Sequence, residues 1–102
     1  ICDEVDLSLY KELIPNKYYI NTIYPNPFNP ITNITYGIPK NAYVNIIVYD
    51  IRGKHIQTLI NEFQNLGYYN INWNAKNYPS GIYFVSMISD QFSQTQKVIL
   101  MK

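Results

Sequence analysis

The sequence predicts an all-β protein, an antiparallel β-sandwich of about seven strands. From Tyr18 onward apolar and polar residues alternate with a period of two, which is the pattern of half-buried strands. The alternating runs are short, recur roughly every ten residues and are separated by Asn, Asp, Gly and Pro. The chain also holds 11 Tyr together with many Ile and Asn, which favours strands and Asn-marked turns. An AT-rich genome explains that composition equally well.

The first three strands are expected at residues 18–24, 32–38 and 42–49. The second run places Ile34, Tyr36 and Ile38 on one face. The third run carries the clearest alternation, because every second side chain is aliphatic, and it contributes three expected core residues, Val44, Ile46 and Val48.

A turn follows the third strand. Asp50 stands at its first position and Gly53 where a positive φ is needed, so residues 50–53 predict a type I turn that leads through a bulge into a fourth strand at 54–60. His55 then lies on a strand surface. Asn61 to Gly67 is expected to be a longer connection.

The last three strands are expected at residues 68–73, 81–89 and 94–101, joined by a Pro-containing loop at 74–80 and a hairpin turn at 90–93. Trp73, Val98 and Leu100 are expected core residues. The final strand ends at the last residues, with Lys97 near its start and Lys102 at its close. Seven runs at this spacing match an immunoglobulin-like sandwich.

Residues 1–17 differ from the rest of the chain. They hold four of the seven acidic residues and near-helical apolar spacing that stops at Pro15, which indicates a short helix or an irregular linker. Because the chain opens at Ile1 without a Met, we expect it to be a piece of a longer protein. The expected organisation is therefore a linker or the tail of a preceding domain at 1–17 and one domain at 18–102.

Several classes of function are disfavoured by composition. A net charge of +1 argues against nucleic acid as a partner. One cysteine and one histidine cannot build an internal disulfide or a Cys/His zinc site. Asp3, Glu4 and Asp6 could offer oxygen ligands to calcium, but the segment lacks the Gly and the closing Glu of an EF-hand loop, and a solvated acidic linker or helix start explains it. No metal or cofactor is therefore expected. No segment approaches the roughly 18 apolar residues of a membrane helix, and no signal peptide is in view.

We also expect no enzyme activity. The three acids after the linker, Asp50, Glu62 and Asp90, each fall at a predicted turn or connection, where hydrogen bonds to the backbone explain them. His55 has no acid near it in sequence, and Ser80 lacks the frame of a hydrolase elbow. No group of residues therefore forms a catalytic constellation.

The most informative segment is Tyr24-Pro25-Asn26-Pro27-Phe28-Asn29-Pro30. Its prolines predict an extended, polyproline-like path into the domain, with Phe28 as an apolar anchor. This segment resembles the opening of the type A carboxyl-terminal sorting domain of the type IX secretion system of Bacteroidetes. The likeness continues in order through Val44, Val48-Tyr49-Asp50, Gly53, Ile56, Leu59, Gly67, Trp73, Ser80-Gly81-Ile82-Tyr83-Phe84, Lys97, Leu100 and Lys102.

The resemblance implies a non-catalytic sorting signal, which acts as an address for secretion. After passage through the periplasm, the type IX machinery in the outer membrane would recognise the domain and export the cargo attached before it. A sortase-like surface peptidase would then cleave the linker, between about Ile14 and Thr22, and anchor the cargo at the cell surface. The residues implied in recognition are Gly53, Ser80, Gly81, Tyr83, Lys97 and Lys102.

A second interpretation remains open. An immunoglobulin-like structural or adhesive module, retained on the cell surface or in an extracellular assembly, would have the same fold. Such a module would self-associate or bind partners through its edge strands.

Overall fold

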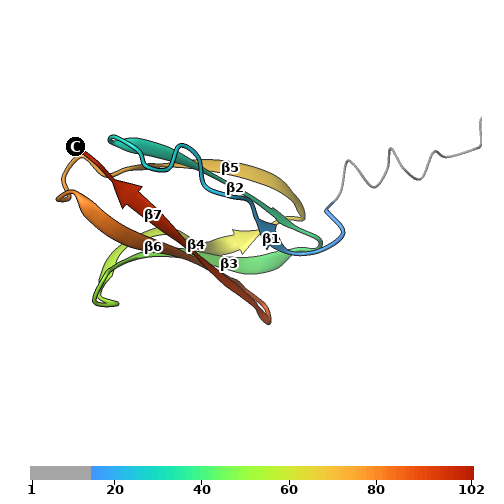
Figure 1. Ribbon diagram of the computed structural model, residues 1–102. Helices are drawn as coiled ribbons and strands as arrows, with labels where there is room; N and C mark the ends of the chain where they lie inside the picture. The colour runs from blue at the N-terminus through green and yellow to red at the C-terminus, as the bar shows by residue number, and fades with distance from the viewer. Residues whose placement is uncertain (1–14) are drawn as a thin grey trace, which may run out of the picture.

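Seven strands and no helix make up residues 15–102, the part of the chain that the computed structural model describes (Figure 1). The strands are β1 (Tyr19–Ile20), β2 (Ile31–Ile38), β3 (Ala42–Asp50), β4 (His55–Gln64), β5 (Gly67–Asn74), β6 (Gly81–Ser89) and β7 (Phe92–Leu100). One sheet has the order β1-β2-β5 and the other β4-β3-β6-β7, with all neighbours antiparallel. The predicted all-β sandwich of about seven strands is confirmed.

The first strand is shorter than the expected 18–24. Only Tyr19 and Ile20 pair with β2, opposite Gly37 and Tyr36. Ile20 and Ile23 are both buried, and side chains three residues apart cannot share one face of a strand. The chain therefore leaves the sheet after Ile20. The side chain of Gln96 in β7 replaces the lost pairing: its amide donates to the Ile20 carbonyl at 3.0 Å, and its oxygen accepts from the Ile23 N–H at 3.0 Å.

The fourth strand is longer than expected, and the predicted connection at Asn61–Gly67 is wrong. β4 pairs with β3 as far as Gln64 opposite Ala42, so only Asn65 and Leu66 remain between β4 and β5. The polar residues of this stretch suit a strand because β4 is a sheet edge with much of its surface exposed.

Both predicted turns occur, with one boundary changed. Between β3 and β4, the Gly53 N–H donates to the Asp50 carbonyl at 2.9 Å, and Gly53 has a φ of 84°, as predicted. Between β6 and β7, Ser89 already pairs with Phe92, so the turn consists of Asp90 and Gln91 rather than residues 90–93. Asp90 takes the positive φ of 58° that this tight turn requires, which Asp tolerates better than most residues.

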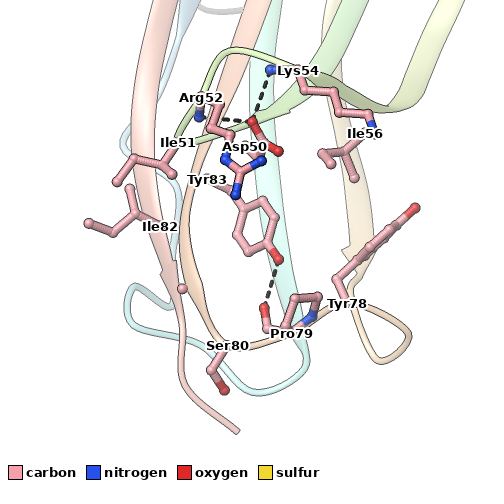
Figure 2. Close-up of a pocket in the computed structure, with 11 residues that line it drawn as sticks. Asp50, Ile51, Arg52, Lys54, Ile56, Tyr78, Pro79, Ser80, Ile82 and Tyr83 are labelled. Atoms are coloured by element: carbon pink, nitrogen blue, oxygen red, sulfur yellow. Dashed lines mark hydrogen bonds between the residues drawn. The ribbon is translucent and has the colours of Figure 1, made fainter.

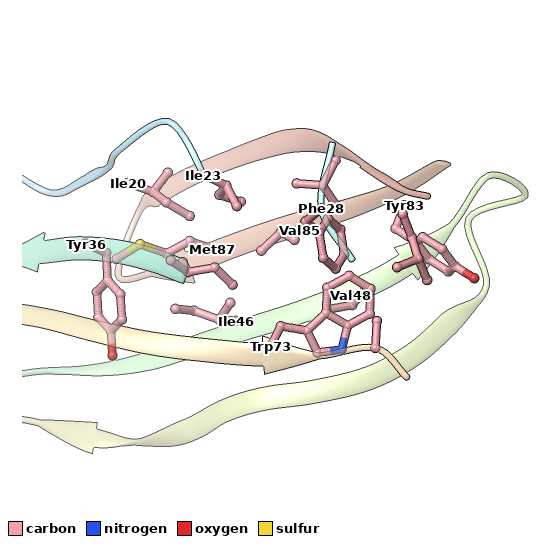
Figure 3. Close-up of a cluster of buried hydrophobic side chains, with 14 of the residues drawn as sticks. Ile20, Ile23, Phe28, Tyr36, Ile46, Val48, Trp73, Tyr83, Val85 and Met87 are labelled. Carbon is pink, nitrogen blue, oxygen red and sulfur yellow. The ribbon is translucent and has the colours of Figure 1, made fainter. Parts of the chain in front are cut away.

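The core lies between the two sheets and centres on aromatic rings (Figure 3). Trp73 packs against Phe28 and Tyr83, with ring centroids 5.4 Å and 5.5 Å apart. Offset and edge contacts at these distances are favourable between aromatic rings. All six residues expected in the core are buried: Val44, Ile46, Val48, Trp73, Val98 and Leu100.

Two glutamines of β4 satisfy the polar atoms of buried aromatic side chains in the opposite sheet. The Trp73 indole N–H donates to the Gln57 side-chain oxygen at 3.1 Å, and the Tyr36 hydroxyl donates to that of Gln64 at 2.6 Å. Burial raises the pKa of Tyr36 to about 12, although the hydrogen bond between Tyr36 and Gln64 opposes the rise. These bonds tie the two sheets together, since an unpaired buried hydroxyl is costly.

The shifted pKa of Tyr36 predicts a loss of stability in alkali. A folded-state pKa of about 12 against an ordinary value of 10.0 means that the contribution of neutral Tyr36 is complete below pH 10 and is lost as the pH rises through 12. We expect Tyr36→Phe to weaken the pH dependence of the free energy of unfolding over this interval, measured by urea titration. Tyr24→Phe is the control, because Tyr24 is 76% exposed. Equal slopes in both variants would contradict the assignment.

A second prediction concerns Gly37, over which the ring of Tyr19 packs. A Cβ on Gly37 would clash with three carbon atoms of that ring. We expect Gly37→Ala to lower the free energy of unfolding by about 1 to 3 kcal/mol, the usual cost of overpacking. The double variant Gly37→Ala/Tyr19→Ala removes the clash, so Gly37→Ala should cost less in the Tyr19→Ala background. A cost that is the same in both backgrounds would show that this contact is unimportant.

Candidate functional site

The two ends of the sandwich are built from different elements. At the first, which we call the linker end, the described chain begins and Tyr18 meets the β6–β7 turn, its hydroxyl donating to Asp90 at 3.4 Å. At the second, the carboxyl end, lie the β3–β4 turn, the loop between β5 and β6, and Lys102 (Figure 1). The six longer strands, β2 to β7, run between these two ends.

A hollow of about 360 Å³ opens at the carboxyl end, and we call it the end hollow (Figure 2). The β3–β4 turn forms one wall and the end of the β5–β6 loop forms the opposite wall. Its lining consists of residues 50–52, 54, 56 and 78–83. The sequence positions of these walls are far apart, so the hollow exists only in the folded domain.

Asp50 shapes the wall formed by the β3–β4 turn. One of its carboxylate oxygens accepts hydrogen bonds from the backbone N–H groups of Arg52 and Lys54, both at 2.9 Å. The bond from Lys54 is the main cause that lowers the pKa of Asp50, and burial opposes it. This carboxylate therefore holds the turn in shape and directs the side chains of Arg52 and Lys54 to the mouth of the hollow.

Aromatic residues shape the opposite wall. The Tyr83 hydroxyl donates to the Pro79 carbonyl at 2.7 Å, which ties the β5–β6 loop to β6. Tyr78 lies beside Trp73 and Tyr83, with centroid distances of 6.0 Å and 6.4 Å. Burial raises the pKa of Tyr83, and the nearby charge of Asp50 and Tyr78 add to the rise. Tyr83 is therefore a neutral hydroxyl whose single proton is already donated.

Lys102 forms two hydrogen bonds with the loop between β5 and β6. Its backbone N–H donates to the Ser80 hydroxyl at 3.0 Å, and its ammonium donates to the Lys76 carbonyl at 2.6 Å. The ammonium keeps two further donors for another group. Lys102 thus joins the end of the chain to the loop that walls the end hollow.

The Pro-rich segment does not follow the extended path expected of it. Its chain bends at 25–27 and 29–30, and the peptide bonds before Pro25, Pro27 and Pro30 are cis. It runs instead along β7: the Phe28 N–H donates to the Ile99 carbonyl, and the Met101 N–H donates to the Phe28 carbonyl, both at 2.9 Å. Phe28 is buried as expected. We call this pairing the clasp.

The structure brings together most of the residues implied in recognition. Ser80, Gly81 and Tyr83 line the end hollow, Gly53 lies between the lining residues Arg52 and Lys54, and Lys102 bonds to Ser80. Lys97 lies apart. It is exposed on β7 opposite Phe84, and its carbonyl accepts a bond from Asn26 of the clasp at 3.1 Å.

Sequence reasoning missed Gln96 and Tyr78. Gln96 binds the segment after β1, and Tyr78 lines the end hollow. No signal in the sequence marks Gln96, because its partners are more than 70 residues away. Tyr78 stands beside Pro79 in a loop, where an aromatic side chain among polar neighbours is the available signal.

The described residues hold no group of three or more His, Cys, Asp or Glu side chains that would suit a metal ion. Nor does any helix within residues 15–102 have the length and apolar character to cross a membrane. What the carboxyl end offers is a shaped surface with cationic side chains and a hollow whose lining is partly polar and partly apolar.

Comparison with known proteins agrees with the resemblance. The family described as the secretion system C-terminal sorting domain matches residues 22–101, from just before the clasp to the end of β7. No curated protein matches the chain. The match covers all seven strands except β1 and includes every residue of the clasp and the end hollow. The chain therefore belongs to the secretion system C-terminal sorting domain family, whose members are sorting signals for type IX secretion on secreted or cell-surface proteins.

Proposed function

We propose that this domain is a non-catalytic address that takes a cargo, attached at its linker end, from the periplasm through the outer membrane. The family match over residues 22–101 carries the proposal. The type IX machinery is the partner, and the cargo lies before residue 18. The domain itself is residues 18–102, and residues 1–17 are a linker to the cargo or the tail of the cargo.

Recognition in this proposal uses the carboxyl end. The support is its position: the Gly53 turn, Ser80, Gly81, Tyr83 and Lys102 meet there, while the chain arrives at the opposite end (Figure 1). A cargo at the linker end leaves this surface open. Lys97 contributes at the side of β7, beside the clasp.

Cleavage by a sortase-like surface peptidase, followed by anchoring of the cargo, is the next step in the proposal. The expected cleavage interval, residues 14–22, narrows to the residues before β1. Tyr19 and Ile20 pair with β2, and Ile23 is 1% exposed. A peptidase needs extended, accessible backbone. Asn16 and Lys17 are exposed and precede the first paired residue, so cleavage belongs there.

A structural or adhesive module is a second candidate, and the free sheet edges favour it. β4 and β5 are outer strands of their sheets and are joined by the short Asn65–Leu66 connection. Around it, Phe63, Leu66 and Tyr68 are 62%, 43% and 48% exposed. Such edges can pair with a second copy of the domain, by strand addition.

The first experiment attaches the whole chain behind an inert periplasmic reporter in a bacterium with a working type IX system. We expect the reporter on the surface or in the medium of that strain, and in the periplasm of a matched strain without the translocon. A folded reporter that stays in the periplasm of both strains would overturn the address. Retention of the uncleaved domain on surface material would instead favour the adhesive module.

Cleavage itself predicts a defined new terminus. Mass spectrometry of the domain released from secreting cells should find its first residue between Asn16 and Tyr18, since this stretch precedes the pairing of β1. Brief trypsin treatment of the purified chain provides a control, because Lys17 should be cut well before Lys97, which β7 holds in a sheet. A terminus beyond Ile20 would contradict the proposed site, since it would require β1 to open first.

A further inference from the structure

Positive charge gathers around the end hollow. Arg52 and Lys54 stand at its mouth, and Lys76 and Lys102 lie beside it, joined through the Lys76 carbonyl. Within residues 15–102 the one ion pair is that of Lys40 with Asp90, 3.1 Å apart at the linker end. The four cations of the carboxyl end therefore have no such ion-pair partner in the described part of the chain.

Asp50 offsets only part of this charge, because it is one carboxylate beside the two cations Arg52 and Lys54. It is the only acidic side chain among the residues that line the end hollow, and one of its oxygens already accepts two backbone hydrogen bonds within the turn. In Figure 2 the Arg52 guanidinium lies between Asp50 and the ring of Tyr83, facing the hollow. The mouth thus presents cationic donors toward any molecule that approaches.

The walls of the hollow are partly apolar. Ile51, Ile56, Tyr78 and Ile82 contribute to them, and Ile51 is 67% exposed at the rim. The Tyr83 hydroxyl is engaged by Pro79. A volume of about 360 Å³ lies near the lower limit of small-ligand sites, which begin at roughly 300 Å³. This space is large enough to admit one aliphatic or aromatic side chain.

We propose that the end hollow binds an acidic segment of a protein of the type IX machinery, which inserts one apolar side chain between the two walls. Carboxylates on either side of that residue pair with Arg52 and Lys54, and the free donors of Lys102 bind a third acidic group. The inference rests on the proposed function and names the chemistry of the partner that reads the same site. An anionic lipid surface fits less well, because a flat surface would not reach into a concave hollow.

The first test is an NMR titration of the folded chain with the capped peptide EDLDE, with EDSDE and KKLKK as comparisons. We expect millimolar EDLDE to shift the resonances of Ile51, Tyr78 and Tyr83, EDSDE to bind at least about tenfold more weakly, and KKLKK not to bind there. Binding should weaken as salt increases. No shifts with EDLDE, or shifts centred elsewhere, would overturn the proposal.

Paired variants test whether the charges at the hollow, rather than a change in the fold or in net charge, determine binding of the peptide. Arg52→Gln/Lys54→Gln keeps the backbone bonds to Asp50 and should weaken EDLDE binding about tenfold or more. Lys17→Gln/Lys40→Gln makes the same change in net charge at the linker end and should leave the affinity unchanged. Ile51→Ser should weaken binding, whereas Ile88→Ser, at an exposed site away from the hollow, should not. If the two charge variants weaken binding equally, or if the two Ile→Ser variants do, the peptide has no localised site at the end hollow.

The secretion assay distinguishes the two levels of the proposal. If the reporter with the unaltered chain is not exported by the working strain, the proposed function fails. If it is exported, and the Arg52→Gln/Lys54→Gln chain is exported equally well, only the acidic-segment inference fails. Tighter binding to phosphatidylglycerol vesicles than to EDLDE, lost in the same variant, would overturn the protein partner and point to a lipid surface.

Discussion

The clasp between the Pro-rich segment and β7 is the constraint on which the sandwich depends. β7 is the last strand of its sheet, and residues 26–28 supply backbone and side-chain partners for its carboxyl half. Gln96 does the same for the segment after β1. Phe28, the centre of the clasp, also enters the core against Trp73. The beginning and the end of the domain therefore stabilise each other, and the last strand supplies Val98 and Leu100 to the core.

The clasp also sets which part of the chain lies at each end of the domain. It runs along β7 toward the carboxyl end, while the chain that precedes it stays at the linker end. A protein attached before residue 18 is thus separated from the end hollow by the length of the strands. The recognition that we propose at the carboxyl end would not depend on the size or fold of the cargo, because no described residue of the linker end lines the hollow.

The alternation of apolar and polar residues predicted those features of the fold that depend only on residues near each other in the sequence. The buried faces of β2 and β3 follow from strict alternation, since a slip by one residue would expose every aliphatic side chain. The Asp50–Gly53 turn follows from its own residues. The ends of β1 and β4 could not be predicted in this way, because Gln96 holds the first and the edge position of β4 permits the polar residues of the second. The resemblance named Ser80, Gly81 and Tyr83, but only the fold shows that Lys97 lies outside the hollow and that Asp50 and Tyr78 border it.

The parts of the end hollow are far apart in the sequence, and the proposed recognition therefore depends on folding. The turn at 50–54, the loop at 74–80 and Lys102 come together only after both sheets form and the clasp fixes β7. An unfolded chain carries the same residues but presents no hollow, and its cations are spread along the polypeptide. A receptor that binds the end hollow therefore selects domains that are complete and folded. The address in such a system is a three-dimensional surface, and failure of the clasp removes it even when every recognition residue is present.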